Sequence, residues 1–156
     1  MATRQEREDA KRTREEIAKD LAAILALTDL HEHTRRGIAW KMIWDFTEVG
    51  GKWNKSYQWS DAAFKHYATT GSYTGLRREH SCPMSLTIPE LLAVTAPTAK
   101  KLMRLLERAA AVCVLTEAED KALNKKYKSC MPPGALPDDI LARYTAMKIA
   151  IKPAPR

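Results

Sequence analysis

Residues 76–86 read LRREHSCPMSL and place an acid beside an imidazole, Glu79 and His80, just after two arginines. We expect residues 76–80 to be extended, and Pro83 discourages their continuation as a regular strand or helix. The segments on either side have helical patterns. No other stretch concentrates so many groups able to do chemistry, so this one is the first candidate for a functional site.

The rest of the chain is mainly helical in pattern. Apolar residues recur at helical spacing from Ile17 onward. We expect helices at residues 17–28, 29–49, 61–69, 87–96, 98–110, 117–126 and 138–147. Asp29 with Glu32, and Thr116 with Glu119, have the spacing of capping boxes. Residues 111–115 (AVCVL) form the clearest strand because they are short and fully apolar.

These patterns predict a mainly α fold: a compact helical domain with a small two-stranded β element formed by about residues 76–80 and 111–115, in a ββα-like arrangement. At 156 residues the chain has the length of one domain. Residues 1–16 are nearly all charged or small and predict a frayed N-terminal helix. Residues 17–150 then form the domain, and residues 151–156 a tail.

Charge favours a polyanionic partner. The chain has 26 Lys+Arg against 19 Asp+Glu, a net charge of +7. Such a surplus suits DNA or RNA, or alternatively an acidic protein or nucleoprotein surface, and it also keeps a small protein soluble. Three cysteines without a CxxC pair fit reduced thiols. With no signal-like or membrane-spanning run, we expect a cytoplasmic protein without a membrane partner.

Cations and rings alternate in residues 52–60 (KWNKSYQWS). Such alternation suits a surface that holds phosphates and bases. The predicted nucleic-acid-binding residues here are Lys52, Trp53, Lys55, Tyr57 and Trp59. The alternative is a loop pinned to the core by its aromatic side chains. Trp40 and Trp44, one helical turn apart, raise the same choice between base stacking and core packing.

Glu79-His80 on an extended segment, followed by strand 111–115 and helix 117–126, resembles the ββα-metal finger of HNH nucleases over about residues 74–127. The resemblance implies that His80 is the catalytic base and that Glu79 binds Mg²⁺ or Mn²⁺. In the closing helix, Asp120 and Asn124 lie four residues apart on one face and offer further oxygen ligands for the metal.

Each of these residues also has a structural interpretation. His80 suits a histidine bonded to a backbone carbonyl, and Glu79 suits an ion pair with Arg77 or Arg78. Asp120 and Asn124 suit a solvated helix face. In the nuclease interpretation, the two arginines instead position the phosphodiester backbone.

Three functions therefore follow from the sequence. The first is a metal-dependent HNH-like endonuclease, active or degenerate. The second is a non-catalytic inhibitor or adaptor, of the kind that phages and mobile elements direct against host defence complexes; this rests on analogy of size and charge. The third is a basic DNA- or RNA-binding module. Whether the protein is an enzyme is left open.

Overall fold

Strand β2 (Leu76–His80) pairs with strand β3 (Val112–Thr116) in a computed structural model that describes residues 12–152. The pairing is antiparallel, with Leu76 opposite Thr116 and His80 opposite Val112. Helix α7 (Glu117–Tyr127) follows β3 directly, and Thr116 and Glu119 form the predicted capping box at its start. The two predicted strands and the predicted helix after them are thus confirmed.

The sheet is larger than predicted. It has four strands in the order β2-β3-β1-β4. Strand β1 (Gln58–Ser60) runs parallel to β3, and β4 (Ile151–Lys152) runs antiparallel to β1. Strand β1 shows that residues 58–60 belong to the sheet and not to a loop, and β4 shows the same for residues 151–152 of the predicted tail. Residues 153–156 of that tail lie outside the described part. Strands β1 and β4 have three and two residues, which is too short for an alternating apolar pattern to mark them.

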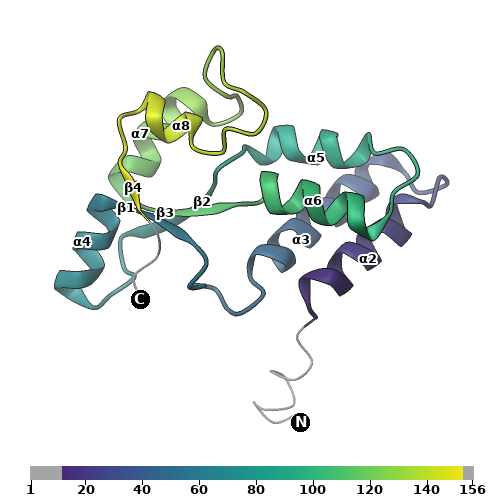
Figure 1. The fold of residues 1–156 in the computed structure, drawn as a ribbon, viewed down its shortest axis with the longest axis horizontal. Coiled ribbons are helices and arrows are strands. Elements are labelled where there is room, and N and C mark those ends of the chain that lie inside the picture. The colour runs from purple at the N-terminus through teal and green to yellow at the C-terminus, as the bar shows by residue number, and fades with distance from the viewer. Residues whose placement is uncertain (1–11, 153–156) are drawn as a thin grey trace, which may run out of the picture.

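Four helices form the other half of the molecule. They are α2 (Arg14–Leu25), α3 (Glu32–Thr47), α5 (Met84–Leu92) and α6 (Ala99–Ala109). Figure 1 shows them together, beside the sheet and the remaining helices α4 (Asp61–Thr70), α7 and α8 (Ala142–Ala146). Their largest core cluster is built from apolar side chains of all four helices. The mainly α fold class is therefore confirmed, with seven helices in residues 12–152.

Several helix boundaries differ from the prediction. Helix α3 is capped by His31, whose Nδ1 accepts from the His33 N–H, so Asp29 does not open it. Helix α5 begins directly after Pro83, because the fixed φ of this proline suits the position before a helix. Helix α8 begins only after Leu141, since residues 137–141 form turns. Of the charged segment predicted for residues 1–16, residues 1–11 lie outside the described part.

The two faces of the sheet carry separate apolar clusters. Val112 and Val114 of β3 pack with Trp59 on one face. Cys113 and Leu115 pack on the other, with residues of α7 and α8. Because successive strand residues point to opposite faces, this alternation also fixes where the side chains of β2 lie.

Candidate functional site on the two faces of strand β2

Glu79 and His80 lie on opposite faces of the sheet. Glu79 pairs in register with Cys113, whose side chain belongs to the cluster beneath α7 and α8. His80 pairs with Val112, which belongs to the other cluster. Two adjacent residues of a regular strand cannot face the same pocket. The structure therefore separates the predicted metal ligand from the predicted catalytic base.

On the Glu79 face, the carboxylate is held by a buried arginine from α8. Arg143 is 0% exposed, and it donates from Nη2 to Glu79 Oε1 at 2.9 Å and from Nη1 to the His80 carbonyl at 2.9 Å. Burial raises the pKa of Glu79, while the Arg143 charge opposes the rise. The structural interpretation of Glu79 as an ion-pair partner is thus correct in kind, but its partner is neither Arg77 nor Arg78.

Asp120 and Asn124 lie on the same side as Glu79. Asn124 Nδ2 donates to Asp120 Oδ1 at 2.8 Å, so the two predicted ligands bind each other. Burial is also the main cause that raises the pKa of Asp120, and the Asp120 charge contributes to the raised pKa of Glu79. The structure thus brings the three predicted ligands to one side of β2. Among residues 12–152, however, no three His, Cys, Asp or Glu side chains are grouped to hold a metal ion.

His80 packs against a tryptophan of α3. The imidazole and Trp44 rings meet edge to face, with centroids 4.4 Å apart and planes at 68°. His80 is 5% exposed, and its Nε2 has no hydrogen-bond partner among residues 12–152. Burial, with help from the Arg78 and Arg143 charges, lowers the pKa of His80 to about 4. The imidazole is therefore neutral at pH 7, enclosed, and on the face away from Glu79 and Asp120.

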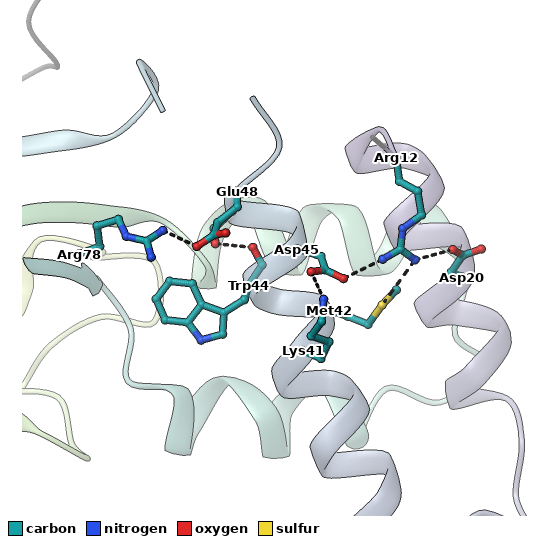
Figure 2. Close-up of polar contacts among 9 residues, drawn as sticks. Arg12, Asp20, Lys41, Met42, Trp44, Asp45, Glu48 and Arg78 are labelled. Carbon is teal, nitrogen blue, oxygen red and sulfur yellow. Dashed lines mark hydrogen bonds and ion pairs between the residues drawn. The ribbon is translucent and has the colours of Figure 1, made fainter. Parts of the chain in front are cut away.

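Arg78 is fixed within the chain. Its guanidinium lies between two indoles, 5.1 Å from the Trp44 ring centre and 5.8 Å from that of Trp53. It also pairs with Glu48 and donates to the Lys52 carbonyl. Figure 2 shows this arginine reaching over Trp44 toward the end of α3. With a side chain only 13% exposed, Arg78 ties the 52–53 loop and α3 to β2.

Two of the predicted nucleic-acid contacts are core residues, which corrects the prediction. Tyr57 is buried and donates its hydroxyl to the Thr47 carbonyl at 2.9 Å. Trp59 is buried in the cluster of β1 and β3. Strand β1 begins directly after Tyr57, and both rings point inward, into the cluster with Val112 and Val114. Arg77 is half exposed and pairs with Glu117 at 3.3 Å.

Three lysines of this region remain at the surface, and Trp53 is partly buried against the cluster of β1 and β3. Lys52, Lys55 and Lys65 are exposed, and none forms an ion pair with residues 12–152. Beside Lys52, the Trp53 ring stacks on Tyr73, with centroids 4.3 Å apart and planes at 11°.

A continuous row of rings crosses the junction of the two halves. Tyr73 stacks in turn on Tyr67 at 4.7 Å. At the other end, Trp44 meets Trp40 edge-on at 6.3 Å. Arg78 joins the two parts, since it lies between Trp53 and Trp44. The row is mostly covered at Arg78, whose side chain is 13% exposed, whereas Trp40 is 50% and Tyr73 36% exposed.

Sequence reasoning missed Arg143 and Tyr73. An arginine inside the apolar stretch ILARYTAM was the available signal for Arg143, because a charge at an inward position needs a partner. For Tyr73 there was no local signal, since its stacking partners come from a separate loop and from α4.

Comparisons with models of protein families, with curated proteins and with solved structures found no match to this chain. No helix within residues 12–152 has the length and apolar character needed to cross a membrane. Function is therefore inferred from the residues and their contacts.

Proposed function

We propose that this protein binds nucleic acid without cleaving it, through the basic and aromatic surface formed by residues 52–78. The observation that carries the proposal is that the exposed lysines Lys52, Lys55 and Lys65 have no ion-pair partner in residues 12–152 and lie in the same segment of the chain as the ring stack of Trp53 and Tyr73. Unpaired cations near a polyanion release its counterions on binding, and this supplies most of the non-specific affinity.

The local charge balance supports this location. Residues 52–78 contain five Lys or Arg and one carboxylate, Asp61, which pairs with Lys152 at 2.8 Å. Because Arg77 and Arg78 are paired with Glu117 and Glu48, the surplus positive charge of the segment resides in its three lysines. A phosphate backbone is the complementary partner for such a surface.

The geometry does not favour metal-dependent hydrolysis by an HNH-type site. A general base must reach the attacking water beside the metal. His80 instead faces Trp44, while Glu79 and Asp120 lie across the sheet. Glu79 is also engaged by the Arg143 cation, whose charge opposes that of a metal ion at the same carboxylate. Mg²⁺ and Mn²⁺ therefore have no role in the proposal.

The proposal is tested by fluorescence anisotropy with a labelled oligothymidine. The variant Lys52→Gln/Lys55→Gln/Lys65→Gln removes the three unpaired cations. A matched control, Lys125→Gln/Lys126→Gln/Lys128→Gln, removes three charges at the end of α7. We expect the first variant to bind roughly 10- to 100-fold more weakly and the control to change much less. Equal losses of affinity in the two variants would contradict the proposal, because they would show that Lys52, Lys55 and Lys65 do not form the binding surface.

The adaptor function remains a separate prediction. It calls for a protein or nucleoprotein partner rather than free nucleic acid. Absence of oligonucleotide binding by the folded parent protein at low salt would contradict the present proposal and leave the adaptor as the better one.

A further inference from the structure

Trp40 presents a large aromatic surface to solvent on α3. It is 50% exposed, and its ring contact is an edge-on approach to Trp44 at 64°. Gly37 lies one turn earlier on the same helical face, and a Cβ atom added there would meet no atom within 4 Å. A helical side chain leans toward the N-terminus of its helix, so the bare glycine leaves the space beside the indole open.

A cation accompanies this ring. Arg36 is four residues before Trp40, on the same face of the helix. Its side chain is 43% exposed. Its ion pair with Glu32 is long, 3.7 Å from Nη1 to Oε1, and both side chains are exposed to solvent. Such a pair contributes little and leaves the guanidinium available for another anion.

The ring is supported from behind. Trp44, on which Trp40 rests, also contacts the guanidinium of Arg78, and Arg78 is held by Glu48 and by the Lys52 carbonyl. Figure 2 shows Trp44, Glu48 and Arg78 together at this end of α3. Trp40 is thus the exposed end of the row of rings that reaches Trp53 and Tyr73. It is placed on a rigid base, which lowers the entropy cost of binding.

We infer that Trp40 is a stacking site for an unpaired base, so that the protein binds single-stranded nucleic acid, with Arg36 beside it for a phosphate. This inference rests on the proposed function and deepens it. Bases within a duplex are stacked on their neighbours and cannot lie on an indole at the flank of a helix, whereas those of a single strand can. The positive net charge of +7 favours a nucleic-acid strand over an apolar protein surface as the occupant.

The test compares three probes of equal length: oligothymidine, the same strand with abasic sites throughout, and a duplex. We expect the parent protein to bind oligothymidine more tightly than either of the other probes. Trp40→Ala should weaken oligothymidine binding about 5- to 100-fold and leave binding to the abasic strand nearly unchanged. Trp40→Phe keeps a ring and should retain most of the affinity.

A matched control is Leu27→Ala, because Leu27 is also 50% exposed but is an aliphatic residue that follows the end of α2 and is not part of α3. It should bind like the parent. The inference is overturned if Trp40→Ala, folded by circular dichroism, binds oligothymidine like the parent, or if abasic and thymidine strands bind equally. If the lysine variant still binds more weakly in that case, the proposed function stands without base stacking. If no probe binds the parent, both fail.

Discussion

Replacing Arg143 by methionine should destabilise the protein by about 3–5 kcal/mol, a large part of the stability of a domain of this size. The arginine is 0% exposed and donates to the Glu79 carboxylate and to the His80 carbonyl, both at 2.9 Å. Methionine fills much of the same volume but leaves a mostly buried carboxylate and a backbone acceptor without their partner. Urea unfolding, followed by circular dichroism, measures the loss as a change in midpoint.

The pH dependence of this loss identifies its cause. Burial raises the pKa of Glu79 in the folded protein, so ionisation of Glu79 opposes folding as the pH rises above the unfolded value of about 4.3. Without Arg143 the folded pKa rises further. The loss in Arg143→Met should therefore be larger at pH 7 than at about pH 3, which lies well below the unfolded pKa and below the raised folded one, so that Glu79 is protonated in both states.

Two variants complete the experiment. In the double variant Arg143→Met/Glu79→Gln, the buried charges are removed together, so its loss should be smaller than the sum of the single losses by about 1–3 kcal/mol. Arg108→Met breaks a surface pair with Glu90 and should cost less than about 1 kcal/mol. A loss in Arg143→Met no larger than that of the Arg108 control would show that Arg143 is not the buried anchor of β2.

Other predictions concern groups near the same strands. The pKa of His80 is lowered to about 4 in the folded protein, so the unfolded chain binds a proton at His80 more readily. The free energy of unfolding should therefore fall by up to about 3 kcal/mol as the pH drops from about 6.5 to 4. His80→Phe should remove this part of the pH dependence of stability. Thr116→Ala removes the α7 cap and should cost about 1 kcal/mol in the same urea assay, with no loss contradicting the capping box. Cys130 is exposed, whereas burial raises the pKa of Cys113; a thiol reagent should therefore label Cys130 first and Cys113 only on unfolding, and early labelling of Cys113 would contradict its burial.

Much of the fold could be predicted from local patterns. The apolar run at 111–115 and the threonine–glutamate capping box after it indicate a strand and a helix start, and both occur. The short strands β1 and β4 could not be predicted, because their pairing depends on distant segments and not on their own composition. At the start of α3, the spacing of Asp29 and Glu32 matches a capping box, but the chain turns into the helix two residues later and His31 takes the capping position.

The candidate site was harder to predict than the fold. Glu79 and His80 are adjacent in sequence, and the prediction of a strand at residues 76–80 already implies opposite faces for them. Because side chains alternate between the two faces along a strand, the predicted strand by itself argues against placing both residues in one catalytic site. The cations beside Tyr57 and Trp59 suggest surface rings, yet the burial of these rings is decided by the sheet that they join. The apolar stretch around Arg143 indicates that its charge needs a partner, but no local pattern identifies that partner as Glu79, 64 positions away.

Whether the unpaired lysines of residues 52–78 hold nucleic acid can be measured through the salt dependence of oligothymidine affinity. For the parent protein we predict a steep linear fall of log affinity with log salt concentration. In Lys52→Gln/Lys55→Gln/Lys65→Gln the slope should be shallower by about 2, since each lost phosphate contact on a single strand removes about 0.7. A parent slope near zero, or the same slope in both proteins, would mean that these lysines do not bind the phosphate backbone.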